Sequence, residues 1–110
     1  MKTITLKIIT PPEIEKKIKE EEKFIVYFTK NTFQYFRAVQ NIFFKNNIGW
    51  FASGCHFLDL ELERHYLALH YDGETLTFED LDDLYYGKFD EYVFEEYIFS
   101  PFGRKKKLFI

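Results

Sequence analysis

The feature that most constrains this chain is a Phe-rich stretch, residues 31–54, which predicts one amphipathic helix followed by a tight turn. Asn31 or Thr32 can cap the helix start, because a short side-chain oxygen there satisfies a free backbone N–H. Apolar residues then recur at spacings of three and four, which places them on one helix face. These positions are Phe33, Phe36, Val39 or Gln40, Phe43 and Phe44. We therefore expect one Phe-rich helix over about residues 32–46, packed on one face of a sheet.

Asparagine and glycine mark the end of this helix and the turn after it. Asn46, Asn47 and Gly49 tolerate the left-handed backbone conformation that ends a helix. Trp50, the only tryptophan, lies between Gly49 and Gly54. The backbone can turn sharply there, and the indole can fold back over the helix.

Two segments before the helix have the pattern of strands. Residues 1–10 alternate between apolar and polar side chains, as a half-buried strand does. The residues expected to face inward are Ile4, Leu6 and Ile8. Residues 24–29, FIVYFT, are continuously β-branched or aromatic, which is typical of a central strand covered on both faces. Between them, residues 12–22 predict a short and mostly solvated helix, with Ile14 and Ile18 on one side.

Further strands are predicted at residues 57–62 and in a hairpin over residues 66–79. In the first segment the residues expected to face inward are Leu58, Leu60 and Leu62. Asp72-Gly73 forms a two-residue hairpin loop, because both residues accept positive φ. The pairs that this loop places opposite each other are Tyr71 and Glu74, Leu69 and Leu76, and Leu67 and Phe78. The face expected to be polar and exposed carries Tyr66, Ala68, His70, Thr75 and Thr77.

The last third of the chain has weaker patterns. Asp80 can cap a short helix through Tyr85, and residues 89–99 fit either a helix or a strand. Residues 104–110 form either an edge strand or a flexible tail. No linker or repeat interrupts residues 1–110, which are therefore expected to form a single α+β domain. Its sheet is expected to be mainly antiparallel, with four to six strands.

The charge is unevenly distributed, although the formal net charge is only −3. The first 54 residues carry a net charge of +4, and the remaining 56 carry −7. Between Asp72 and Glu96, ten acidic residues accompany Lys88 as the only basic one. Such a segment repels nucleic acid and attracts a basic protein surface, although charge runs more often only face solvent. With a pI near 5.6, the chain lacks the basic footprint of a protein that binds nucleic acid directly.

Cysteine usage and hydropathy indicate the cellular setting. Cys55 is the only cysteine, so an internal disulfide is excluded and a reducing, cytoplasmic setting is expected. The sequence has no signal-peptide pattern and no apolar run of about 18 residues, so neither secretion nor membrane association is expected.

The sequence contains no catalytic or metal-binding signature. Cys55 and His56 would point to opposite faces of a strand, so the thiol and imidazole would not meet, and Cys55 is expected to be a small buried residue. The other side chains that bear on metal binding are Asp59, His65 and His70, and none has the spacing of a known ligand set. We expect the histidines to be structural or exposed, and the protein to be a non-enzyme without metal or cofactor.

About half of the chain, residues 24–80, resembles a group of small bacteriophage proteins. In that group a strand and a helix ending in an aromatic or leucine pair precede a G-x-W-x-S-G-like turn and a hairpin with an Asp-Gly loop. The matching positions here are Phe24–Thr29, Phe36, Val39, Gln40, Phe43, Phe44, Gly49, Trp50, Ser53, Gly54 and Asp72-Gly73. The resemblance implies a phage or prophage origin. It also implies a role in binding and disabling a host factor, as anti-CRISPR and other anti-defence proteins do, and it assigns no site residues.

Two functional hypotheses follow. The first is an inhibitor that docks an acidic, Tyr-rich surface on the basic groove of a host nucleic-acid enzyme, because rings supply contact area and carboxylates match Arg and Lys. Its candidate residues are Asp72, Glu74, Asp80, Asp82, Asp83, Tyr85, Tyr86, Asp90, Glu91, Tyr92, Glu95 and Glu96. The second is a sponge that sequesters a small signalling nucleotide, with candidate residues Gly49, Trp50, Ser53 and Gly54. The turn is better explained if Trp50 only caps the helix and the glycines allow the turn, because tryptophan is usually buried. Both a monomer and a homodimer are compatible with the sequence.

Overall fold

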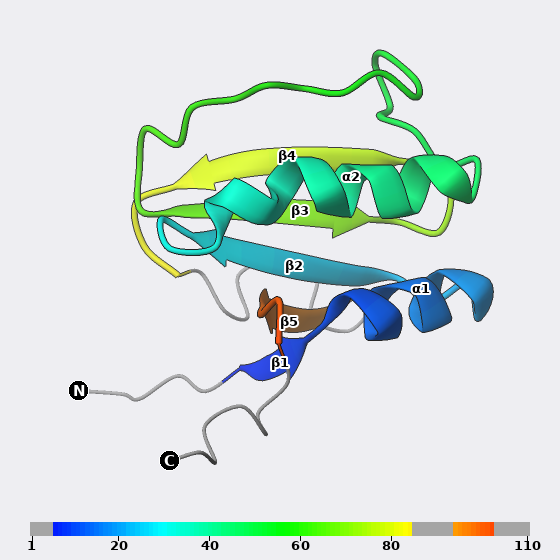
Figure 1. Ribbon diagram of the computed structural model, residues 1–110, viewed down its shortest axis with the longest axis horizontal. Helices are drawn as coiled ribbons and strands as arrows, with labels where there is room; N and C mark the ends of the chain where they lie inside the picture. Colours follow the sequence, from blue (N-terminus) through cyan, green and yellow to red (C-terminus); the bar gives the residue numbers. More distant parts are fainter. Residues whose placement is uncertain (1–5, 85–93, 103–110) are drawn as a thin grey trace.

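The computed structural model describes residues 6–84 and 94–102, and these ranges form one sheet with helices on it (Figure 1). The strands are β1 (Lys7–Ile9), β2 (Phe24–Thr29), β3 (Tyr66–Tyr71), β4 (Leu76–Leu81) and β5 (Glu95–Phe99). The helices are α1 (Pro11–Lys19), the short 3-10 helix η1 (Phe33–Tyr35) and α2 (Phe36–Lys45). The expected α+β fold class, with four to six strands, is confirmed. The expectations for Ile4, for residues 89–93 and for residues 104–110 lie outside the described residues.

The sheet is mixed rather than mainly antiparallel, with the strand order β1-β5-β2-β3-β4. β5 pairs in parallel with both β1 and β2, whereas β3 is antiparallel to both β2 and β4. Because β1 and β2 run in the same direction, the chain needs a crossover between them, and α1 provides it. The strand from the end of the chain fills the place between these two. Hydrophobic periodicity does not identify a strand's neighbours, so the sequence did not predict this insertion.

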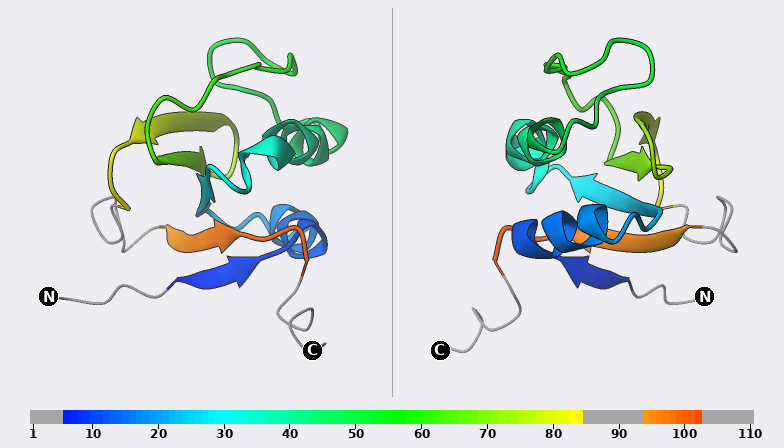
Figure 2. Two further views of the ribbon diagram at one scale, coloured as in Figure 1. Left: turned by 60° about the vertical axis from the view of Figure 1, so that its left-hand side comes forward. Right: turned by 90° about the vertical axis from the view of Figure 1, so that its right-hand side faces the viewer.

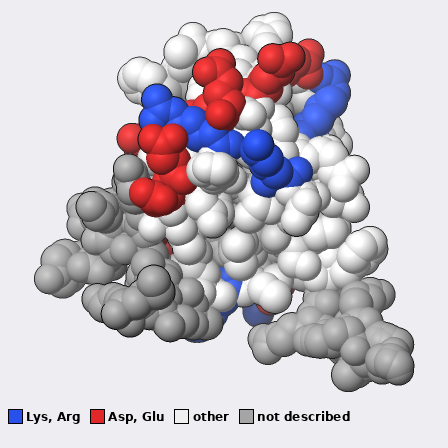
Figure 3. All heavy atoms as spheres, turned by 90° about the vertical axis from the view of Figure 1, so that its left-hand side faces the viewer, with Lys and Arg blue, Asp and Glu red and all other residues white. Residues whose placement is uncertain are grey.

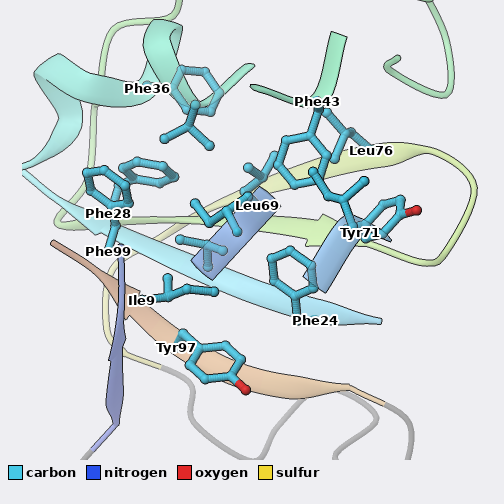
Figure 4. Close-up of a cluster of buried hydrophobic side chains, with 14 of the residues drawn as sticks. Ile9, Phe24, Phe28, Phe36, Phe43, Leu69, Tyr71, Leu76, Tyr97 and Phe99 are labelled. Atoms are coloured by element: carbon cyan, nitrogen blue, oxygen red, sulfur yellow. The ribbon is translucent and has the colours of Figure 1, made fainter. Parts of the chain in front are cut away.

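Both helices lie on the same face of the sheet, and the main core is enclosed between the two layers (Figures 1 and 2). Aromatic rings fill much of this core (Figure 4). The ring centroid of Phe24 lies 6.1 Å from that of Phe43, 5.7 Å from that of Tyr71 and 6.3 Å from that of Tyr97. These contacts join β2 to α2, β3 and β5, so rings from four elements stabilise one cluster.

β2 is a central strand covered on both faces, as its continuous apolar sequence predicts. Each residue from Phe24 to Phe28 is fully buried. Alternate residues belong to different clusters: Phe24, Val26 and Phe28 face the helices. Ile25 and Tyr27 face the reverse side of the sheet, where they pack with Ala68 and Leu81.

The two N-terminal elements each bury one side in the main core. In β1 the residue that enters the main core is Ile9, which is 1% exposed, whereas Ile8 is 36% exposed. Ile8 therefore faces away from the main core, one residue out of phase with the prediction, whereas Leu6 packs against the buried cluster on the reverse face. The helix α1 is shorter than residues 12–22, but Ile14 and Ile18 face one side as expected. Both are buried in the main core, so α1 contributes to the core, while its other residues are exposed or half-buried, as expected of a mostly solvated helix.

The Phe-rich helix forms close to its predicted range. Its apolar face is buried through Phe36, Val39, Gln40 and Phe43. The expected cap at Asn31 or Thr32 is wrong, because the Thr32 hydroxyl oxygen instead accepts a hydrogen bond of 2.9 Å from the Thr29 N–H and closes the turn after β2. At the other end, Asn47 has a φ of 63° and supplies the left-handed residue that was expected.

The β3–β4 hairpin forms with a four-residue loop rather than the predicted two-residue loop. The observed register places Tyr71 opposite Leu76, Leu69 opposite Phe78 and Leu67 opposite Asp80. Every predicted pair is therefore wrong by two residues, although the side chains keep their faces. The cause is Asp72, whose carboxylate accepts hydrogen bonds of 2.8 Å from the N–H groups of both Glu74 and Thr75. This Asx turn lengthens the loop, with Gly73 at a φ of 96°.

The predicted strand at residues 57–62 does not form, yet its leucines face inward as expected. Leu58, Leu60 and Leu62 are partly buried against the main core. The N–H and C=O of Leu58 bind the side chain of Gln40 rather than a neighbouring strand. A side chain thus satisfies backbone groups that a strand would pair with another strand.

Two further expectations are wrong. The face of the hairpin expected to be exposed is partly covered, because Ala68 is fully buried against Ile25 and Tyr27. The predicted helix from Asp80 to Tyr85 does not begin at Asp80, because Asp80 and Leu81 are the last residues of β4.

Candidate functional site

The turn after α2 is closed by backbone hydrogen bonds and attached to β4. The N–H of each of Trp50 and Gly54 donates to the carbonyl oxygen of the other at 2.9 Å. Phe51 N–H donates to the Leu76 carbonyl oxygen, and Leu76 N–H donates to the Gly49 carbonyl oxygen, both at 2.9 Å. Gly49 is required because a Cβ atom there would lie 2.5 Å from the Gly54 carbonyl carbon. Three N–H groups of this turn, at Trp50, Phe51 and Gly54, are thus engaged within the protein.

A buried glutamine holds the Trp50 ring in place. Trp50 is only 4% exposed, and its Nε1–H donates to Gln40 Oε1 at 3.0 Å. The same oxygen accepts a hydrogen bond of 2.8 Å from Leu58 N–H, and Gln40 Nε2 donates to the Leu58 carbonyl oxygen at 3.0 Å. The indole is therefore part of the core and does not present a stacking surface. The sequence signal for this role was a glutamine on the apolar face of a helix.

The segment from this turn to β3 is also held by Arg37. Its guanidinium lies 3.9 Å from the ring centroid of Phe57 and donates to the Asp59 carboxylate at 3.0 Å. Together with the Gln40 contacts, these interactions keep the segment beside α2.

A cavity of about 400 Å³ lies between the Trp50 turn and the first half of β4. It is lined by Trp50, Phe51, Ala52, Ser53, Leu58, Leu76, Thr77 and Phe78. Two of these rings reach solvent, because Phe51 is 76% exposed and Phe78 is 40% exposed. Most of the lining is apolar, so the cavity suits an apolar side chain better than a phosphate group.

The predicted acidic surface does not form one patch among the residues that the structure describes. Asp72, Glu74 and Glu95 lie where β3 ends and β5 begins, because Phe24 pairs with both Tyr71 and Glu95. A second group, Asp80, Asp82 and Asp83, lies at or beyond the end of β4, which is the opposite end of the sheet. Glu96 points to the reverse face. The other candidates, Tyr85, Tyr86, Asp90, Glu91 and Tyr92, lie outside the described residues.

At the hairpin end, internal contacts occupy several carboxylates. Burial by itself would raise the pKa of the Asp72 carboxyl, but the N–H groups of Thr75 and Glu74 hold this pKa below its ordinary value. Hydrogen bonds from Tyr97 and Lys17 likewise lower the pKa of the Glu95 carboxyl. Glu95 lies 3.0 Å from the Lys17 ammonium. These two acids are therefore structural as well as charged.

At the β4 end the acids are more accessible. Figure 3 shows acidic and basic side chains interleaved over the upper part of this face, with uncharged surface below them. Asp82 pairs with Arg64 at 3.2 Å, and both side chains are more than half exposed. Asp80 differs, because its Oδ1 atom is buried and makes no hydrogen bond within the described residues. We call Glu79, Asp80, Asp82 and Asp83 the acidic edge.

The reverse face of the sheet holds several neighbouring polar side chains that the sequence did not indicate. The Tyr27 hydroxyl donates to Glu96 at 2.5 Å. Burial, followed by this hydrogen bond, raises the pKa of the Tyr27 hydroxyl far above its ordinary value, so the hydroxyl stays protonated. Burial also lowers the pKa of His70, an effect that the Glu79 carboxylate opposes. Adjacent strands bring these side chains together, and spacing within one segment gives no sign of it.

The candidate metal ligands are not brought together in the part of the chain that the structure describes. Within residues 6–84 and 94–102, no group of three or more His, Cys, Asp or Glu side chains is arranged to hold a metal ion. His56 and His65 are exposed. Cys55 is also exposed, so the expectation of a buried cysteine is wrong. It follows the tight turn, where side chains point to solvent.

None of the helices in the described ranges is long and apolar enough to cross a membrane. Comparison with protein-family models, curated proteins and solved structures finds no match for this chain. Its function must therefore be inferred from its own surfaces.

Proposed function

We propose that this chain is a phage-encoded binding protein that inhibits a host nucleic-acid-processing or defence factor by docking the acidic edge on a basic surface. One observation carries the proposal: the exposed ring of Phe78, which lines the cavity together with the exposed ring of Phe51, directly precedes the acidic edge in β4. An apolar centre beside a charged rim is the usual composition of a protein interface. Carboxylates at the rim match Arg and Lys of a groove that binds nucleic acid, and they accelerate encounter.

The charges at the two ends of the sheet support the acidic edge over the hairpin end. Glu95 is already paired with Lys17, and Asp72 is already engaged by two N–H groups. Asp83 and Glu79 are exposed and make no salt bridge within the described residues. Their charge is therefore available to a partner.

The test is capture of host proteins by the tagged full chain from bacterial lysate, washed at low salt and at about 0.5 M salt, since salt screens charge pairs. We expect a nucleic-acid-processing or defence factor to be retained at low salt and released at high salt. The double variant Asp82→Lys/Asp83→Lys should lose this capture.

The control Glu20→Lys/Glu74→Lys makes the same charge change at the hairpin end and should retain capture. Equal capture by both variants would refute a role for the acidic edge. Equal loss in both would show that net charge, rather than this surface, governs binding. Retention of no such factor by the folded wild-type chain would refute the proposed function.

The alternative, a sponge for a small signalling nucleotide, is supported by the cavity beside Ser53, whose size suits a small ligand. Two features weigh against it. The Trp50 ring is buried with its N–H bound to Gln40, and the cavity lining is largely apolar. The acidic-edge proposal therefore has the stronger geometric support.

A further inference from the structure

β4 is an edge strand of the sheet. Only part of its outer side makes backbone hydrogen bonds within the described residues. In an antiparallel pair, alternate residues direct their N–H and C=O groups toward the neighbouring strand and away from it. Leu76 directs both groups away from β3, because they bind Gly49 and Phe51. By the same alternation, Phe78 and Asp80 also direct their backbone groups outward.

These outward groups have no backbone partner in the described ranges. Within residues 6–84 and 94–102, no backbone hydrogen bond reaches the outer side of Phe78 or Asp80. The chain between α2 and β3 passes beyond this edge in Figures 1 and 2, and it shares backbone hydrogen bonds with the outer side of β4 only at Leu76. An unpaired strand edge of this kind is a template for an additional strand.

The cavity lies where the side chains of an added strand would point. The cavity lies between Leu58, in the segment between α2 and β3, and residues Leu76 to Phe78 of β4. There is therefore space beside the outer edge of β4. Alternate side chains of an extended peptide project to the same face of a sheet. A peptide paired with Phe78 would therefore place an apolar side chain in this cavity, next to the exposed Phe51 ring.

Charge indicates what kind of segment fits. The acidic edge occupies the second half of β4 and the turn after it, and the buried Asp80 Oδ1 atom makes no hydrogen bond within the described residues. A Lys or Arg of an added strand would supply a donor there. A second copy of β4 is disfavoured, because pairing two such strands would bring their carboxylates together.

We propose that β4 binds an extended segment of a basic partner protein as an additional strand, with an apolar side chain in the cavity and Lys or Arg against the acidic edge. This inference rests on the proposed function, because it describes how that partner is held. Main-chain hydrogen bonds would supply affinity, and the cavity and carboxylates would supply specificity.

The test selects random peptides of about ten residues, the length of a long strand, on the full-length chain. We expect enriched peptides that alternate apolar residues and contain Lys or Arg. The variant Asp80→Pro removes one outward N–H, which an edge strand tolerates because that group does not bond to β3. Asp80→Ala is the matched control, because it removes the same carboxylate and keeps the N–H. Binding to Asp80→Pro should be about five- to tenfold weaker than to Asp80→Ala, the loss expected for one hydrogen bond.

A second measurement does not depend on the folding of a variant. Peptides N-methylated at the residues that face β4 should lose binding, whereas N-methylation at the alternate residues should leave it intact. Equal effects of the two methylation patterns, or no enrichment of alternating basic peptides, would overturn the proposal. So would stronger peptide binding after deletion of residues 104–110, whose sequence RKKKLFI is itself basic and apolar, or a dimer that Asp80→Pro dissociates.

The two proposals fail in different ways. If charge reversal at Asp82 and Asp83 abolishes capture of a host factor but no peptide adds to β4, the inhibitor proposal stands and strand addition fails. If peptides bind by strand addition but no nucleic-acid-processing or defence factor is captured, the edge binds strands and the proposed function fails.

Discussion

At the scale of single residues, Gln40 does most to join separate parts of the chain. It is fully buried and links α2 to the Trp50 indole and to both backbone groups of Leu58. A buried polar side chain is stable only when its hydrogen bonds are made, and here three are made. Gln40 therefore positions two walls of the cavity, at Trp50 and Leu58.

Replacing Gln40 by Leu should lower the free energy of unfolding by about 2–4 kcal/mol, because each buried group left without a partner costs roughly 1–3 kcal/mol. The Trp50 emission maximum should change, because the indole N–H loses its hydrogen-bond acceptor and the polarity around the ring changes. Urea denaturation followed by fluorescence measures both effects. The control is Gln34→Leu, which makes the same change at an exposed position and should have little effect. Equal stability of the two variants would contradict the role of Gln40.

At the scale of secondary-structure elements, the Asp72 side chain sets the register of the hairpin. Its carboxylate binds two N–H groups of the loop, and the strands resume pairing only at Leu76. Because strand pairing resumes at Leu76, this residue lies beside Gly49 and Phe51. The position of the Trp50 turn therefore depends on the same loop. A two-residue loop would instead pair Tyr71 with Glu74.

Asp72→Ala should therefore lower the free energy of unfolding by about 1 kcal/mol, the usual net value of such hydrogen bonds. Asp72→Asn keeps the acceptor oxygen and should be closer to the wild type. Urea denaturation of the three proteins measures the differences, and NMR chemical shifts of the Glu74 and Thr75 amides report on the loop. An Asp72→Asn variant as unstable as Asp72→Ala would show that the charge, rather than the Asx turn, supplies the stability.

At the scale of the whole molecule, the sheet is buried on both sides but by different means. The helices cover one face, and the other buries Ile25, Tyr27 and Ala68 around a polar group that includes His70. Burial disfavours the charged imidazole, so the pKa of His70 is lower in the folded protein than in the unfolded chain, although Glu79 opposes the shift. Folding is thereby coupled to pH through this face.

The unfolded chain binds the His70 proton more tightly, so stability should be highest above about pH 6.5 and should fall as pH decreases toward the lower folded-state pKa. The urea midpoint measured between about pH 7.5 and pH 5 tests this prediction. The variant His70→Gln should have a flatter profile over that window, whereas His65→Gln, at an exposed site, should match the wild type. Identical slopes for His70→Gln and the wild type would contradict the prediction.

Local sequence patterns predicted the secondary-structure elements better than they predicted which elements lie next to each other. The burial of Phe24 to Phe28, the shared face of Ile14 and Ile18, and the helix end at Asn47 all follow from short-range sequence. The candidate site was predicted less well. The acids near Asp72 and those near Asp82 are close in sequence but lie at opposite ends of β4, because a strand separates groups by about 3.3 Å per residue.

The sequence by itself determined that β2 is buried on both faces, that Ile14 and Ile18 share one buried side, and that the Phe-rich helix ends near Asn47, because side-chain size, polarity and backbone preference act within a few residues. Only the tertiary structure decided that β5 lies between β1 and β2, that Gln40 binds Trp50, and that the outer side of β4 is left unpaired beyond Leu76 in the described residues. These are contacts between distant segments. Their stability depends on the packing and hydrogen bonds of the whole fold, and the local periodicity of a sequence does not report these.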